Sequence, residues 1–307
     1  MLSIKHRSFS ASALVMLAAA AVPRANADEY AKTYAVASRP EVHVQAGDSS
    51  VRVTTSDTNQ VEFRVRSQGV RVAIGFGGQV SVDSQQSGNR VELVVKTTPA
   101  LTIGFNDRRL ETEVQMPENA DLLIETHDGA VELSAVNGNI TVHTKDGAIR
   151  ATQLSGRIDL HSSDGGINAQ SLKGDARLHS GDGSIGAGGI DGKLEASTND
   201  GSIHVEGRFD SLTITSGDGS VTARVAQGSK MTSDWSVQTH DGSLRMSIPS
   251  DLRANLDVSA NNGHISLDLP VTVQGINSQS KIRGTLNGGG PLLTVRSGDG
   301  SVRLAGT

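Results

Sequence analysis

Apolar and polar residues alternate through the middle of the chain, and the alternation repeats with a period of eighteen positions. Each repeat holds two pairs of apolar positions, for example Ile149 with Ala151 and then Ile158 with Leu160. The residues between them are mostly polar or charged. A period of two is typical of β-strands that bury one face and expose the other. We therefore predict two short strands in every repeat.

Turn signals keep the same period as the apolar pairs. An Asp-Gly dipeptide recurs at steps of 18, beginning at Asp128, Asp146, Asp164, Asp182, Asp200 and Asp218. A second glycine series lies halfway between them, at Gly138, Gly156, Gly174 and Gly192. Glycine at a fixed phase indicates a tight turn, where φ can be positive. The unit is therefore two half-repeats of nine residues, each with one strand and one turn.

Two strands and two turns in each repeat predict one coil of a parallel β-solenoid, with successive coils ~4.8 Å apart. A meander of β-hairpins is the alternative, because Asp-Gly is also a hairpin signal. A meander does not require the same residue type at equivalent positions of every repeat, so the regularity favours stacked coils. One coil alone buries too little to offset the entropy of ordering it, so neighbouring coils must stabilise one another.

Irregular alternating runs flank the repeat, with a predicted loop at Gly75–Gly78 and a predicted loop or hairpin over 275–290. We expect these flanks to cap the open edges of the solenoid. The predicted fold is thus all-β, a parallel solenoid with irregular β-rich ends. Its expected parts are a signal peptide at 1–27, an N-terminal capping part at 28–120, regular coils at 121–225, and longer coils with a cap at 226–307.

The first residues have the pattern of a secretory signal peptide. Lys5 and Arg7 precede an apolar run, Ala11–Val22, and Ala25-Asn26-Ala27 provides a small-residue cleavage site after Ala27. Twelve apolar residues are too few to span ~30 Å of hydrocarbon. No later segment is long and apolar enough to cross a bilayer. We predict export to the periplasm, the cell envelope or the outside of the cell.

Composition narrows the range of functions. The 307 residues include no cysteine, which excludes disulfides, thiolate zinc sites and cysteine nucleophiles. Positions 1–27 hold three of the 28 basic residues and no acid, so the remainder has 25 basic against 33 acidic side chains. Such a balance argues against a nucleic-acid partner. An aromatic content of 3% disfavours platforms for stacking bases or sugars.

The six aspartates of the Asp-Gly series would form a row along one edge. Adjacent carboxylates repel, and Ca²⁺ could relieve that repulsion. The series differs from calcium-binding nonapeptides, because it has typically one glycine in each half-repeat. We favour an Asx hydrogen bond from each aspartate to its own turn. The hydroxyl residues two positions earlier are expected to bond within turns and between coils; they are Thr126, Thr144, Ser162, Ser180, Thr198 and Ser216.

Three histidines at the same spacing, His143, His161 and His179, should stack in a short row. Adjacent imidazoles can share a metal, but we favour a solvated outward-facing row. No catalytic residue and no cofactor site is predicted, since regular recurrence of Ser, His and Asp argues for structure and not for one triad. Trp235 and Phe209, with the predicted loop at Gly75–Gly78, are candidate apolar contacts, and core packing, the more frequent use of such residues, is the alternative.

Several segments together resemble a known bacterial family. They are Val114-Gln-Met-Pro117, Leu122-Leu-Ile-Glu-Thr126, the repeated [Thr/Ser]-x-Asp-Gly-x-[Ile/Val], and the closing runs Thr239–Pro249 and Ser297–Leu304. This pattern resembles the "putative adhesin" domain of β-strand repeats over about 36–304. The resemblance implies an exported, non-enzymatic β-solenoid on or near the cell envelope. It carries no catalytic residues.

We therefore expect a protein that presents polar rows to an envelope protein, a polysaccharide or another cell. One alternative is a calcium-binding module similar to a β-roll. Another is an enzyme that cleaves polysaccharides on a β-helix, although such sites interrupt the repeat and none interrupts it here between 126 and 223. A mechanical or regulatory envelope module without a ligand is a further alternative. Fold alone does not decide among them.

Overall fold

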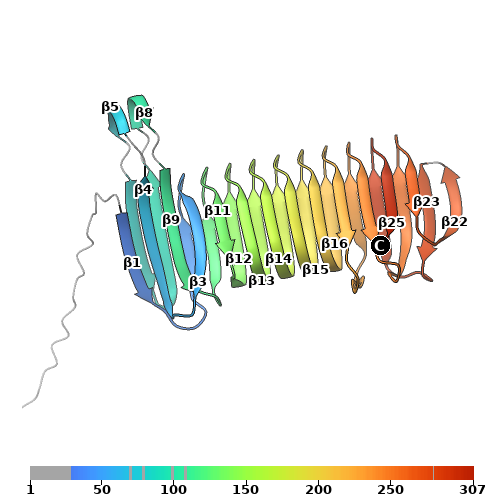
Figure 1. Ribbon diagram of the computed structural model, residues 1–307, viewed down its shortest axis with the longest axis horizontal. Coiled ribbons are helices and arrows are strands. Elements are labelled where there is room, and N and C mark those ends of the chain that lie inside the picture. Colours follow the sequence, from blue (N-terminus) through green and yellow to red (C-terminus); the bar gives the residue numbers. More distant parts are fainter. Residues whose placement is uncertain (1–28, 69–70, 78–79, 98–99, 107–108, 279) are drawn as a thin grey trace, which may run out of the picture.

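The computed structural model describes residues 29–68, 71–77, 80–97, 100–106, 109–278 and 280–307. The regular structure in these residues is entirely β. The strands form an elongated rod of stacked coils (Figure 1). The predicted all-β solenoid is confirmed. The signal peptide predicted at 1–27 lies outside the described residues. Within them, no helix has the length and apolar character needed to cross a membrane.

The middle of the rod stacks its coils in chain order. Its strands are β10 (Asp121–Glu125), β11 (Val131–Ser134), β12 (Asn137–Thr144), β13 (Ile149–Ser162), β14 (Ile167–Ser180), β15 (Ile185–Thr198), β16 (Ile203–Ser216) and β17 (Val221–Val225). Neighbours pair in parallel with the offset of one repeat, as in Ile149 with Ile167 and His161 with His179. Equivalent residues of successive coils therefore lie directly side by side.

Each coil has two corners, and the two corners differ. At the corner halfway between Asp-Gly dipeptides, β13 to β16 bend without a break. The two halves of each bent strand belong to two parallel sheets, one on each side of the coil, as β16 shows by pairing with β17 through its first half and with β18 through its second half. Three glycines there have positive φ: Gly156 (109°), Gly174 (112°) and Gly192 (135°). The Asp-Gly glycines are needed for another reason. A Cβ on Gly183 would lie 2.4 Å from the carbonyl oxygen of Gly165 on the preceding coil, so only glycine permits the close approach.

A continuous row of buried hydroxyls joins the Asp-Gly corners. Ser180 Oγ accepts a hydrogen bond from the Gly183 N–H (3.0 Å) and donates to the Gly165 carbonyl of the preceding coil (2.9 Å). Ser162 and Ser216 make the equivalent two bonds, each accepting from the glycine N–H of its own corner and donating to the glycine carbonyl of the preceding coil. The predicted role of this row, within turns and between coils, is confirmed.

The N-terminal end departs from chain order. Its strands are β1 (Glu29–Ala35), β2 (Glu41–Gln45), β3 (Ser50–Ser56), β4 (Gln60–Gln68), β5 (Arg71–Gly77), β6 (Val80–Ser87), β7 (Arg90–Thr97), β8 (Ala100–Asn106) and β9 (Arg109–Pro117). The coil of β2 and β3 lies between the coil of β7 and β9 and the coil of β10 and β11. Antiparallel strands cover the outer side: β4 and β1 beyond β9, and β6 beyond β7.

Strands β5 and β8 form a separate two-stranded antiparallel sheet. The sequence predicted a loop at Gly75–Gly78, and that prediction is wrong for Gly75 to Gly77, which belong to β5. Glycines at Gly75 and Gly77 suggested a break, but ladder pairing with β8 keeps this segment extended. Gly78 lies outside the described residues.

The C-terminal end departs from chain order in the opposite direction. Its strands are β18 (Trp235–Thr239), β19 (Leu244–Ile248), β20 (Ala254–Ala260), β21 (Ile265–Asp268), β22 (Val271–Ser278), β23 (Lys281–Leu286), β24 (Leu292–Ser297) and β25 (Val302–Gly306). The last coil of the chain, β24 with β25, lies between the coil of β18 and β19 and the coil of β20 and β21. An antiparallel hairpin of β22 and β23 covers β20, and it contains most of the predicted 275–290 loop or hairpin.

Trp235 and Phe209 lie in the core with exposures of 1% and 0%, so the prediction that they form surface contacts is wrong. Their rings meet edge to face with centroids 6.3 Å apart. The Trp235 Nε1–H also reaches the Asp210 carbonyl at 3.3 Å. The step between Asp-Gly dipeptides here, from Asp218 to Asp241, is longer than in the regular coils. Trp235 belongs to this longer coil and packs against Phe209 of the preceding coil, on β16, because the apolar surface of both rings is most stable away from water.

Candidate functional site

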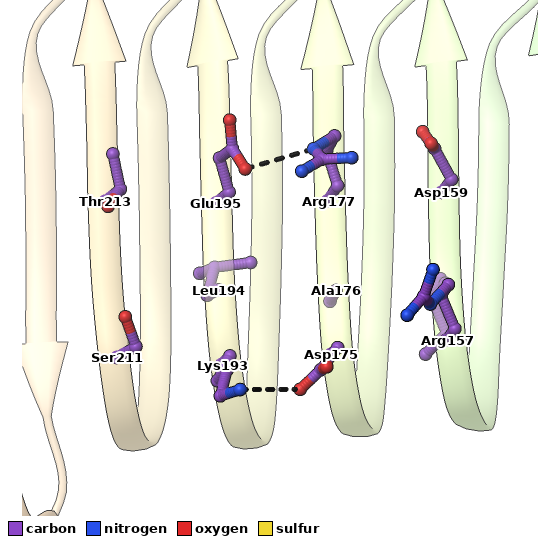
Figure 2. A pocket seen from close by; sticks show the side chains of 11 residues that line it. Arg157, Asp159, Asp175, Ala176, Arg177, Lys193, Leu194, Glu195, Ser211 and Thr213 are labelled. Atoms are coloured by element: carbon purple, nitrogen blue, oxygen red, sulfur yellow. Dashed lines mark hydrogen bonds and ion pairs between the residues drawn. The ribbon is translucent and has the colours of Figure 1, made fainter. Parts of the chain in front are cut away.

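The outer face of the sheet that contains β12 carries rows of charged side chains across β13, β14 and β15. We call this surface the charged face. In-register pairing creates the rows, because it sets equivalent positions of successive coils side by side. One row reads Arg157, Asp175, Lys193 and the other reads Asp159, Arg177, Glu195. Figure 2 shows that the charges alternate along each row and also between the rows.

Two ion pairs join neighbouring coils on the charged face. Arg177 Nε lies 3.0 Å from Glu195 Oε2, and Lys193 Nζ lies 3.8 Å from Asp175 Oδ1. The hydrogen bond from Arg177 to Glu195 raises the pKa of Arg177 above its ordinary value. These side chains are more than half exposed, so each pair contributes little to stability. Their chemical groups remain available to a ligand.

A shallow groove of about 380 Å³ lies among these charged residues. Its base includes Ile158, Ala176 and Leu194, and Ser211 and Thr213 line it beyond the charged rows. The lining has three cationic and three anionic side chains, so its formal charge is balanced. Both donors and acceptors of hydrogen bonds therefore border one groove. Such an arrangement can bind a ligand rich in hydroxyl or amide groups.

The histidine row lies on the same sheet, one row beyond Asp159. The rings of His161 and His179 stack with centroids 4.8 Å apart, and His143 meets His161 edge to face at 5.7 Å. His179 Nδ1 lies 2.8 Å from Ser197 Oγ. Burial lowers the pKa of His161, and the two neighbouring histidines lower it further. The row is therefore packed together and only partly solvated at its centre.

A carboxylate that the sequence interpretation missed stands beside the histidine row. Glu125 of β10 pairs in register with His143 of β12. Glu125 lies one repeat before His143 in the sequence, so the constant spacing of the repeat was the signal that could have identified it. Even so, no group of three His, Cys, Asp or Glu side chains in the described part of the chain is arranged to hold a metal ion.

The six aspartates of the Asp-Gly series are all exposed at one edge of the rod. None of their carboxylates makes a hydrogen bond among the described residues, so the predicted Asx bonds are wrong. The physical reason is that a buried hydroxyl already satisfies the turn, as Ser180 does for the Gly183 amide. The row continues past the regular repeat, because Gly300 lies against Gly242, which lies against Gly219. The sequence predicts these later turns from Asp241-Gly242 and Asp299-Gly300, but their uneven spacing does not show the order in which the coils stack.

The comparisons with known proteins bear mainly on the fold. A family model described as Toastrack DUF4097 matches residues 40–305. A "putative adhesin" from Parabacteroides merdae ATCC 43184 is 10% identical, with 91% of this chain and 97% of that chain covered and a TM-score of 0.50. At this identity the similarity shows the fold alone.

Two further solved structures have lower TM-scores. A "putative adhesin" from Bacteroides fragilis NCTC 9343 is 11% identical, covering 91% of this chain and 97% of that chain, with a TM-score of 0.37. A "putative cell adhesion protein" from Clostridium sporogenes ATCC 15579 is 11% identical, covering 91% of this chain and 100% of that chain, with a TM-score of 0.26. No curated protein matches the chain.

Proposed function

The chain belongs to the Toastrack DUF4097 family, and we propose that it is a non-enzymatic adhesion module of the cell envelope. Its ligand is an extended, hydroxyl-rich polymer, an envelope polysaccharide, which lies along the charged face. The leader at 1–27 directs export. The parts at 28–120 and 226–307 cap the rod, and the regular coils at 121–225 carry the ligand.

The observation that carries this proposal is the groove of balanced charge on the charged face. A sugar hydroxyl both donates and accepts hydrogen bonds, so a border of alternating cations and anions can bind it from either side. Bonds to charged groups are stronger than bonds between neutral groups. The balance of three cations and three anions favours a ligand of low net charge. The rows also run from coil to coil, which suits a polymer better than a compact molecule.

Two further observations agree with binding and not with catalysis. The ion-paired side chains that line the groove are more than half exposed, so the groove does not exclude water, whereas catalysis favours a water-excluding site. The Parabacteroides merdae protein, which shares the fold, is described by its name as an adhesin. One fold can host many functions, so that name agrees with the proposal but is not the evidence on which the proposal rests.

A pair of matched variants tests the proposal. Arg177→Ala removes a cation from the groove, and Arg224→Ala removes an equally exposed cation that pairs with Glu206 on the other sheet. Residues 28–307 should sediment with purified envelope polysaccharide, and Arg177→Ala should weaken this binding by about tenfold. Arg224→Ala should leave it unchanged. Equal effects of the two variants would contradict the proposed site.

The same preparation tests the alternative functions. The polysaccharide should keep its viscosity during long incubation with the protein, since the proposal includes no cleavage. Binding should also be the same in EDTA as in millimolar Ca²⁺. A fall in viscosity would favour an enzyme, and a requirement for Ca²⁺ would favour a calcium-dependent module built on the exposed aspartate row.

A further inference from the structure

A second cluster of charges lies at the C-terminal end of the rod, and its charges are unbalanced. Three cations surround the carboxylate of Asp257 on β20: Arg283 Nε at 3.5 Å, Arg296 Nη2 at 3.6 Å and Lys281 Nζ at 3.9 Å. The Asp257 side chain is only 15% exposed. One carboxylate cannot neutralise three cations, so the cluster has a formal charge of +2.

This excess is unusual within the molecule. On the regular coils, ion pairs join one cation to one anion, as in Arg177 with Glu195. At the N-terminal end the imbalance is reversed, because Arg64 and Arg66 share three glutamates, Glu29, Glu62 and Glu113. The whole chain has a net charge of −5. A locally basic surface on an acidic protein calls for a source of negative charge outside the chain.

A groove of about 520 Å³ lies beside the cluster, where the sheet of β20 and β24 meets the Asp-Gly edge. Arg296 and Lys281 line it, together with the polar side chains of Ser259, Asn261 and His240. No acidic side chain is among the lining residues. Two edge aspartates, Asp241 and Asp299, follow the lining residues His240 and Gly298 in the chain but do not line the groove themselves. Asp241 pairs with His240 at 3.6 Å.

Several donors in this groove are open to a ligand. Arg296 Nη2 lies 3.6 Å from Asp257 Oδ2, beyond ordinary hydrogen-bond distance, and the Arg296 side chain is 53% exposed, so its guanidinium is open to a ligand. The side chains of Ser259 and Asn261 make no hydrogen bond within the described residues, and the structure therefore leaves their polar atoms available to a ligand. A planar guanidinium with an ammonium and two neutral polar groups suits an oxyanion, because arginine binds carboxylate and phosphate through paired bonds.

We propose that this groove, which we call the basic groove, binds an oxyanion, the phosphate or carboxylate group of an envelope polymer. The site is separate from the charged face, and its ligand is anionic, whereas the polymer proposed for the charged face has a low net charge. A polymer that carries phosphate and one that carries uronic acid would present the same chemistry to Arg296 and Lys281.

The test is isothermal titration of residues 28–307 with inorganic phosphate and, separately, with trigalacturonate, at an ionic strength held constant with sodium chloride. At least one of the two oxyanions should bind. The preferred one identifies whether phosphate or carboxylate is the natural group. Arg296→Gln should weaken that binding by about tenfold or more, since it removes a charged donor. Lys281→Gln should weaken it in the same direction.

Arg245→Gln is the matched control. Arg245 is exposed on β19, in the coil next to β24 and β25, and forms no ion pair within the described residues. The Arg245→Gln variant should bind phosphate or trigalacturonate as tightly as the unaltered protein does. Circular dichroism melting of the three variants checks that each is folded. The proposal is overturned if neither oxyanion binds above the chloride background, or if Arg296→Gln and Lys281→Gln bind as tightly as Arg245→Gln.

Discussion

The regular coils and the C-terminal end use the same stacking contacts but connect them in different ways. Between β10 and β17 each coil lies on the coil that immediately precedes it in sequence. At the C-terminal end, Ser236 of β18 instead pairs with Thr294 of β24, although β20 comes first in the chain. The N-terminal end repeats the arrangement, since β2 lies between β7 and β10.

This difference has a consequence for stability. In a simple solenoid the first and last coils are the outermost and fray most easily. Here the first and last coils of the chain lie inside the stack, and antiparallel strands cover β7, β9 and β20 of the outermost coils. Among the described residues, β21 pairs with β25 alone. The first or last coil of the chain therefore leaves the stack only by giving up contacts with two neighbouring coils, as a coil in the middle does. We expect these two coils to be as resistant to unfolding as the middle.

Deletion of residues 292–307 should have the largest effect. It removes the coil that separates β18 from β20, along with four buried side chains, Leu293, Val295, Val302 and Leu304. Each contributes roughly 1.5–3 kcal/mol, so we expect Tm to fall by more than about 10 °C. Circular dichroism melting measures the fall, and limited proteolysis should cut first within 250–286. An unchanged Tm would mean that the last coil is only a peripheral addition.

Gly183→Ala should rank next, because it tests close stacking in the middle. The added Cβ would lie 2.4 Å from the Gly165 carbonyl oxygen and 2.6 Å from the Gly166 nitrogen. Backbone must shift, so we expect a loss of about 3 kcal/mol or more in unfolding free energy. Gly186→Ala in the same coil is the control, since its Cβ would meet nothing within 4 Å. Urea denaturation that gave both variants equal stability would contradict the stacking.

Ser180→Ala should have a smaller effect in the same corner. It leaves the Gly183 amide and the Gly165 carbonyl without the hydroxyl that joins them. Loss of a buried hydrogen-bond partner costs about 1–3 kcal/mol. Ser163→Ala, at a partly exposed neighbouring corner residue, should cost less than about 0.5 kcal/mol. Denaturation curves with equal midpoints for the two variants would show that the hydroxyl row adds nothing.

The smallest effect expected is the pH dependence from His161. Burial holds the folded-state pKa of His161 below its ordinary value. Between the two values the unfolded chain binds more protons, so the stability of the fold decreases as pH falls through this window. His161→Gln should make the unfolding free energy less dependent on pH just below about 6.5, the ordinary pKa of histidine. A variant with the same pH profile as the unaltered protein would exclude His161 as the source.

The parts of the fold that follow the repeat could be predicted from sequence. Equal spacing correctly predicted the buried hydroxyl of Ser180 in its row, the inward-facing Ile167 and the stacked histidines. In-register stacking explains this, because residues one repeat apart in sequence lie side by side in the structure. The same rule gives the charged face, since Arg177 and Glu195 are separated by one repeat. The sequence analysis did not assemble these charges into a site, because charge alternation between coils carries no sequence motif.

The ends could not be predicted in this way. Asp257 and Arg296 are far apart in sequence, and only the insertion of β24 beside β20 brings them together. Alternation of apolar and polar residues predicts a strand but not the strand with which it pairs. In the regular coils the constant spacing of the repeat also predicts the pairing, and the irregular spacing at the ends gives no such information. For the same reason the burial of Trp235 depends on the longer coil around it.

Cysteine cross-linking tests the interleaved stack most directly, because the chain has no cysteine of its own. Ser236→Cys with Thr294→Cys joins paired positions of adjacent strands, ~4.8 Å apart, within the range of a disulfide. Gln238→Cys with Ser259→Cys joins positions separated by β24, at ~9.6 Å, which is too far. The account predicts that mild oxidation links the first pair and not the second. A disulfide in the second pair without one in the first would mean that the coils stack in chain order.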